Sequence, residues 1–211
     1  MVSLPSLDWP RFTAAVVLLL APLPLFFGKG VELRELERSW ESVWMRALLL
    51  PWHWVDLVRA GTGTWLLMAA IGLTSTAEVM PGKTLLALAA GVLVVGAVVQ
   101  AVACRADEVF FIPFVYVLAE TAVLFPPLLA ALALILAITA AFAFRSLAAF
   151  LWCLPVCLVA LGQWLYPNWL LLGIGAMVPV LAALLPLLFH RAFVFALRKF
   201  PADPEAMHDL R

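Results

Sequence analysis

The stretch of sequence that decides the fold is VFFIPFVYVLAETAVLFPPLLAALALILAITAAFAF, residues 109–144. It contains no basic residue and one acidic residue. As a single helix its 36 residues would be about 54 Å long, whereas the hydrocarbon core of a membrane is about 30 Å thick. Pro126 and Pro127 lie near its middle, where proline removes a backbone hydrogen-bond donor and disfavours helix in the residue before it. The stretch therefore predicts two transmembrane helices, 109–125 and 128–144.

The composition of the whole chain agrees with a membrane as its solvent. Of the 211 residues, 66% are hydrophobic and 12% are charged, and the mean hydropathy is +1.09. Ordinary soluble domains are roughly half apolar and about a quarter charged. This chain therefore has about half of the charge that a water-facing surface needs, and we expect an integral membrane protein.

Further apolar stretches have the length of a membrane span, which is about 17 to 25 residues. They are 12–28, 60–76, 84–104, 146–166 and 169–189. A signal peptide is the alternative for the first stretch, but no small-residue cleavage site follows it. A re-entrant segment is the alternative for the second, because its first residues are polar. The predicted fold class is an all-α polytopic transmembrane helix bundle of about seven spans, or about six if 109–144 is one kinked span.

Residues 31–50 have a different pattern. Apolar side chains recur at steps of three and four, and charged side chains fill the other face. This pattern predicts an amphipathic helix on the cytoplasmic surface of the membrane, with Trp40 and Trp44 at the level of the lipid headgroups. We expect Pro51 to end this helix or to turn the chain into the next segment. Residues 190–211 are expected to form a polar cytoplasmic tail.

The basic residues predict the orientation. With seven spans and the N-terminus outside, eleven Lys and Arg residues lie on the cytoplasmic side and only Arg11 and Lys83 lie outside. If 109–144 were one span, the division would be six against seven, and the asymmetry of the positive-inside rule would be lost. The charge pattern therefore favours two helices. We expect a location in the bacterial inner membrane, with the C-terminus in the cytoplasm.

Glu120 is the one ionisable side chain well inside an apolar span. A carboxylate is costly there unless it is protonated, paired or facing a cavity. The functional hypothesis is a proton or cation site, with Tyr116 one turn earlier as its neighbour. The alternative is a neutral carboxyl that hydrogen-bonds to another helix, for which Gln100 and Gln163 are candidate partners.

Residues at the expected membrane edge are candidates for contacts with lipid headgroups. His53 and Arg59 precede the second span, and His190 and Arg191 follow the last. Each pair has the charge to bind a lipid phosphate. The alternative for both pairs is a plain interfacial anchor.

No motif in the sequence predicts a reaction. Cys153 and Cys157 share a helix face, but a metal site needs further ligands and the chain has only three histidines, so we predict no metal and no cofactor. An intramembrane enzyme would need a nucleophile and a base at one depth, and the sequence places no such pair, which favours a non-enzymatic role. Zero net charge without a basic cluster argues against a nucleic-acid partner.

Two functions remain as expectations. The leading hypothesis is a non-enzymatic subunit or scaffold of a larger membrane complex, whose partners are membrane lipids and either another membrane protein or further copies of the chain. The alternative is a small transporter or lipid-handling protein that uses Glu120 within a proline-kinked bundle.

The predicted topology is tested with reporter fusions at Arg11, Lys83, Pro127 and the C-terminus. We expect external signals at the first three positions and a cytoplasmic signal at the C-terminus, because this arrangement places eleven basic residues inside. A cytoplasmic signal at Pro127 would contradict the pair of helices and the count of seven spans.

Overall fold

The computed structural model describes residues 7–21, 31–32, 51–73, 82–102, 109–189 and 192–195. Within these residues the chain is mainly helical. The helices are α1 (Trp9–Leu20), α4 (Pro51–Ala70), α5 (Lys83–Val102), α6 (Phe114–Leu124), α7 (Pro127–Phe144), α8 (Leu147–Leu165) and α9 (Trp169–Phe189). The strands are β1 (Val31–Glu32), β2 (Val109–Phe111) and β3 (Ala192–Phe195). In the described part of the chain, four helices are long and apolar enough to cross a membrane, namely α5, α7, α8 and α9.

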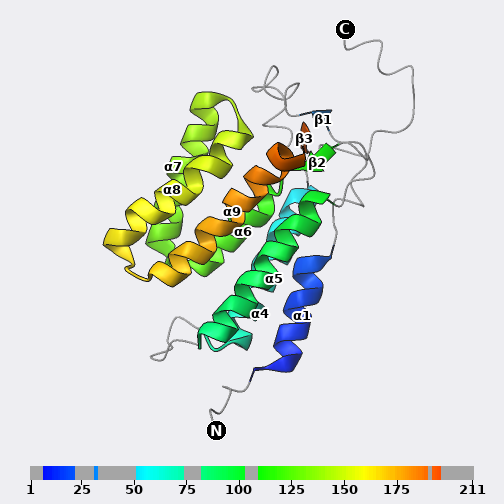
Figure 1. The fold of residues 1–211 in the computed structure, drawn as a ribbon, viewed down its shortest axis with the longest axis vertical. Coiled ribbons are helices and arrows are strands. Elements are labelled where there is room, and N and C mark those ends of the chain that lie inside the picture. Colours follow the sequence, from blue (N-terminus) through cyan, green and yellow to red (C-terminus); the bar gives the residue numbers. More distant parts are fainter. Residues whose placement is uncertain are drawn as a thin grey trace, which may run out of the picture.

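The helices form one packed group with a second pair beside it. The packed group contains α1, α4 and α6, with α4 between the other two. Helices α5 and α9 pack alongside this group. The start of α1 lies at the end of α4, since the amide of Asp8 donates to the carbonyl of Ala70 at 3.1 Å, so these two helices are antiparallel. Helices α7 and α8 pack on each other, and α8 also packs on α9 (Figure 1).

The chain leaves helical geometry between α6 and α7, where the two prolines predicted a break. Phe125 is extended, with φ −111° and ψ 156°, and Pro126 follows with φ −52° and ψ 142°. The ring of Phe125 packs against the backbone of α9 at Gly175, where any side chain would overlap with it. After this break α7 packs mainly against α8 rather than against α6.

Helix α6 is shorter than the sequence predicted. The expected helix at 109–125 is wrong at its start, because Val109–Phe111 pairs with β3 and the helix begins only at Phe114, after Pro113. Its 11 residues extend for about 16 Å, whereas a membrane core is about 30 Å thick. By itself α6 is too short to cross a membrane.

A small sheet joins three segments that lie far apart in the sequence. The strand order is β1-β3-β2, with β3 antiparallel to β1 and parallel to β2. The sheet lies at the end of the bundle where α5 and α9 end and α6 begins (Figure 1). The sequence analysis predicted only helices and no sheet, because strands of two to four residues are too short to show a periodic pattern.

The sheet also changes two predicted segments. Val31 and Glu32 lie in β1, so the amphipathic helix expected at 31–50 does not begin at residue 31. Its remaining residues, 33–50, lie outside the described residues. Within the expected tail at 190–211, residues 192–195 form β3, and the others also lie outside the description.

Helix α1 begins three residues earlier than predicted. Asp8 caps it, since its Oδ1 accepts from the amide of Arg11 at 3.2 Å, and Pro10 stands in the first turn, where no amide hydrogen is needed. The described helix ends at Leu20, and residues 22–28 of the expected span lie outside the description.

Helix α4 also differs from the expected span at 60–76. It begins at Pro51 and ends at Ala70. Pro51 takes the first position of α4, where the missing amide hydrogen costs nothing, and the helix expected to precede it lies outside the described residues. By contrast, the bounds of α5, α7, α8 and α9 lie within two residues of those expected from the sequence.

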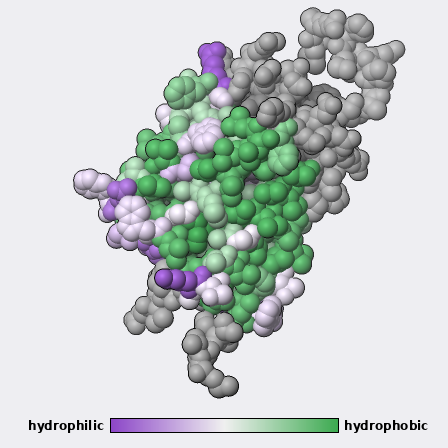
Figure 2. Space-filling view, in the orientation of Figure 1, coloured by the Kyte–Doolittle hydropathy of each residue, from purple (hydrophilic) through white to green (hydrophobic). Residues whose placement is uncertain are grey.

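The packing of α7 places small residues inside and large ones outside. Its buried residues are Leu129 and the alanines Ala130, Ala133, Ala137 and Ala141. Leu128 and Ile135, on the outward face, are 62% and 59% exposed. The face of the molecule seen in Figure 2 is likewise mostly hydrophobic, with hydrophilic residues near its margins. This arrangement is typical of helices that pack closely within a lipid solvent.

Two glycines of α5 provide a matched test of this packing. We expect Gly96→Ala to lower the free energy of unfolding by about 1–3 kcal/mol, because the new methyl group would overlap with the Tyr116 hydroxyl and press on the carbonyl of Leu19. Gly91→Ala meets no atom within 4 Å and should be neutral or stabilise by up to about 1 kcal/mol. Thermal unfolding in detergent measures both, and equal effects would contradict the close approach at Gly96.

Candidate functional site

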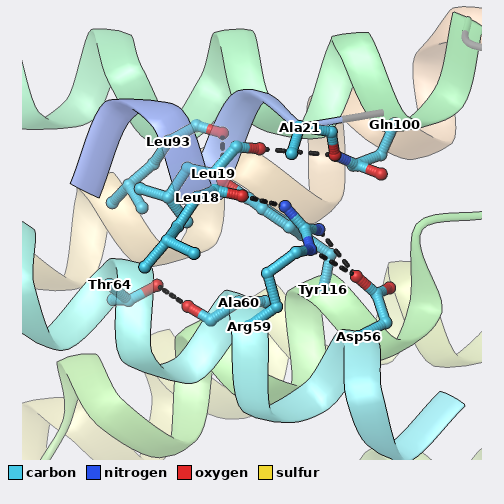
Figure 3. Close-up of polar contacts among 10 residues, drawn as sticks. All are labelled: Leu18, Leu19, Ala21, Asp56, Arg59, Ala60, Thr64, Leu93, Gln100 and Tyr116. Carbon is cyan, nitrogen blue, oxygen red and sulfur yellow. Dashed lines mark hydrogen bonds and ion pairs between the residues drawn. The ribbon is translucent and has the colours of Figure 1, made fainter. Parts of the chain in front are cut away.

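The polar interior of the bundle is organised around the end of α1. The last carbonyl groups of a helix have no partner within the helix. Here other helices supply the donors. Arg59 of α4 donates through Nη1 to the carbonyl of Leu18. Gln100 of α5 donates through Nε2 to the carbonyls of Leu19, at 3.3 Å, and Ala21, at 2.8 Å (Figure 3).

Arg59 is held in place by Asp56, one turn earlier on α4. Its Nε and Nη2 lie 2.9 Å and 2.6 Å from Oδ1 of Asp56. The two side chains are 8% and 13% exposed, so this is a nearly buried ion pair. The guanidinium also lies at the negative end of the α1 dipole, which favours a cation. The positive charge is therefore matched within the bundle by a carboxylate and a helix end.

Tyr116 joins α6 to α5. It is fully buried, and its hydroxyl donates to the carbonyl of Leu93 at 3.1 Å. Gly96, one turn further along α5, leaves the space that the phenol ring needs. The buried hydroxyls of Thr64 and Thr121 donate to the carbonyls four residues before them in their own helices. These polar groups are satisfied inside the bundle.

Glu120 differs from its neighbours. It lies one turn after Tyr116 on α6 and is 2% exposed. Neither of its carboxyl oxygens has a hydrogen-bond partner in the described part of the chain. A buried carboxyl without a partner favours the neutral form, because the charged form would lose its hydration without compensation.

The partners considered for Glu120 are engaged elsewhere or lie away from it. The hydroxyl of Tyr116 bonds to Leu93, and the amide nitrogen of Gln100 bonds to the end of α1. Gln163 is exposed near the end of α8. The sequence therefore located the buried carboxyl but not its surroundings.

The residues expected at lipid headgroups have varied positions. Arg59 is buried and bonded to Asp56 and Leu18, a different set of partners from the expected lipid phosphate. His53 is partly buried in the first turn of α4. His190 and Arg191 lie outside the described residues.

No group that could hold a metal ion is found among the described residues. Three or more His, Cys, Asp or Glu side chains do not come together there. Cys153 and Cys157 are free thiols, partly buried on α8. The described interior thus offers hydrogen bonds and one ion pair, but no ligand set for a metal.

Sequence reasoning missed two features of this interior. It did not pair Asp56 with Arg59, although residues three apart on a helix are neighbours and opposite charges at that spacing attract. It also gave Gln100 no role at α1, because no sequence pattern shows which distant backbone carbonyls a buried amide will meet. Only the packing of α1 against α5 brings them together.

Comparisons with known proteins add no further assignment. The chain matches no family model, and no curated protein or solved structure shows significant similarity to it.

The Arg59–Asp56 pair is tested with a double-mutant comparison. We expect Arg59→Met to lower the free energy of unfolding by about 3–5 kcal/mol, since it leaves a nearly buried carboxylate without a counter-charge. Adding Asp56→Leu should restore part of this loss, because no unpaired charge then remains. Unfolding in detergent gives both values. A double variant as unstable as Arg59→Met alone would contradict the ion pair as the main contribution.

Proposed function

We propose that the chain is a non-enzymatic subunit or scaffold of a larger complex, embedded in the bacterial inner membrane. The observation that carries this proposal is the packing of α7. This helix buries a row of alanines and turns several of its large residues outward, among them Leu128, Ile135 and Leu136. An outward apolar surface of this kind suits lipid tails or the helices of a membrane partner.

The sheet supports separate crossings of the membrane at α6 and α7. Strands β2 and β3 pair directly, which supports a position of both on the same side of the membrane. The chain between β2 and β3 must then cross the membrane an even number of times. The helices α6, α7, α8 and α9 give four crossings, whereas a single kinked span at 109–144 followed by α8 and α9 would give three. This favours separate crossings at α6 and α7, with the short α6 enclosed by other helices.

Exposed tryptophans support the same placement. Trp9 begins α1, Trp164 lies near the end of α8 and Trp169 begins α9, all at the end of the bundle away from the sheet (Figure 1). Trp54, in the first turn of α4, is exposed at the other end. Indole rings prefer the two membrane interfaces, and the positive-inside rule assigns the sheet end to the cytoplasm.

The interior supports a structural role rather than catalysis. Arg59, Gln100 and Tyr116 bond to backbone carbonyls of neighbouring helices, so their donors hold the bundle together. A small transporter or lipid-handling protein is the second candidate. The observation that favours it is Glu120, whose carboxyl oxygens have no partner among the described residues.

Site-specific photo-crosslinking in native membranes tests the scaffold proposal. A photoreactive amino acid at Ile135, which faces outward on α7, should give one discrete protein adduct. The same group at Ala133, which is buried on this helix, is the matched control and should give none. The adduct's mass distinguishes a second copy of the chain from another subunit. Lipid adducts alone at Ile135, and at Leu128 and Leu136, would contradict a partner on this face.

A further inference from the structure

The small sheet has its last strand in the middle. Its order is β1-β3-β2, so within the described sheet β1 and β2 each pair with β3 and not with each other. Strand β1 follows α1, β2 lies between α5 and α6, and β3 follows α9 (Figure 1). The sheet therefore closes only when the C-terminal strand enters between two strands that precede it in the sequence.

Strand β2 continues almost directly into α6. Only Ile112 and Pro113 separate the end of the strand from the start of the helix, and both are buried. The carbonyl of Pro113 already accepts from the amide of Val117 at 3.0 Å, in the first turn of α6. Because the connection is so short and so buried, a shift of β2 along the bundle would also shift the start of α6. The position of β2 thus sets the position of the helix.

Helix α6 needs such a support because it is short. With 11 residues it does not reach from one membrane surface to the other, so the thickness of a membrane does not fix its depth. Two contacts of its first turn depend on that depth. The ring of Phe114 lies 4.5 Å from the ring of Phe150 on α8, and the hydroxyl of Tyr116 donates to the carbonyl of Leu93 on α5 at 3.1 Å. Both contacts are made next to β2.

We propose that β3 is a clasp that holds α6 at its depth by pairing with β2. In the closed state, which the structure represents, Val194 of β3 lies opposite Glu32 of β1 and opposite Phe111 of β2. When β3 is released, β2 loses its strand partner and the first turn of α6 loosens. Strands of two to four residues have little stability of their own, so the clasp can open while the helices stay folded.

This inference goes beyond a scaffold role and does not depend on a partner. The absence of a protein adduct at α7 would leave it intact. Conversely, a failure of the clasp would leave the photo-crosslinking result unaffected.

Disulfide cross-linking of the full chain, with its native cysteines replaced by serine, tests the closed state. Val194→Cys should form a disulfide with Glu32→Cys in one double variant and with Phe111→Cys in another, because each pair is in register on neighbouring strands. Glu32→Cys with Phe111→Cys is the matched control. It should form none, since two strand spacings, about 9–10 Å, exceed the Cα separation that a disulfide allows. A cross-link in the control, or none in the other two, would overturn the proposal.

Hydrogen exchange tests the hold on α6. Phe193→Pro removes an amide hydrogen from the central strand, whereas Phe193→Ala loses the same ring but keeps that hydrogen. Exchange of the Val117 amide should therefore rise several-fold in Phe193→Pro relative to Phe193→Ala. The amide of Ser146, which donates to the carbonyl of Ala141 at 3.0 Å after α7, should exchange equally in both variants.

Two outcomes of the exchange measurement would contradict the clasp. Equal exchange of Val117 in the two variants would mean that α5 and α9, which also contact β2, hold the strand without β3. Faster exchange of Ser146 together with Val117 in Phe193→Pro would mean that β3 supports the whole bundle rather than α6. The cross-linking series contains no proline variant, so it tests the closed state even if Phe193→Pro fails to fold.

Discussion

A helix that ends inside a bundle buries its last carbonyl groups where no water can hydrogen-bond to them, and α1 ends in this way. In such apolar surroundings each unpaired backbone group costs on the order of several kcal/mol. Donors from two other helices remove this cost, since Arg59 reaches Leu18 and Gln100 reaches Leu19 and Ala21. The positions of α4 and α5 around α1 are therefore linked to one local requirement of backbone chemistry.

The same requirement explains where charge is tolerated. Arg59 is nearly buried, yet Asp56 and the end of α1 offer it negative charge from two sides. Glu120 has no such compensation among the described residues, although it is buried at least as deeply. The two buried ionisable groups thus differ in kind. One is fixed by its partners, and the other is accommodated without a hydrogen-bond partner among the described residues.

The large apolar residues on the outside of the bundle are explained by a lipid solvent in place of water. In a soluble protein large apolar residues face inward, whereas α7 buries a row of four alanines with Leu129 and exposes several large residues, among them Leu128, Ile135 and Leu136. Small residues let helices approach closely, and in lipid the outward residues lose nothing by exposure. Close approach also matters at Gly96 and Gly175, where the absence of a side chain admits Tyr116 and Phe125.

The sequence by itself determined the solvent, the helical class, the break at the two prolines and the bounds of the long apolar helices. These properties are encoded locally, in composition, in the length of apolar runs and in residues that cannot donate a hydrogen bond. It also located Glu120 as an unusual charge. It did not determine the sheet, because β1, β2 and β3 are too short to show a pattern and pair only across the length of the chain. Nor did it determine which donors reach the end of α1. Tertiary structure decided both, since contacts between segments distant in sequence depend on how the helices pack, and the sequence of one helix does not encode which partner it meets.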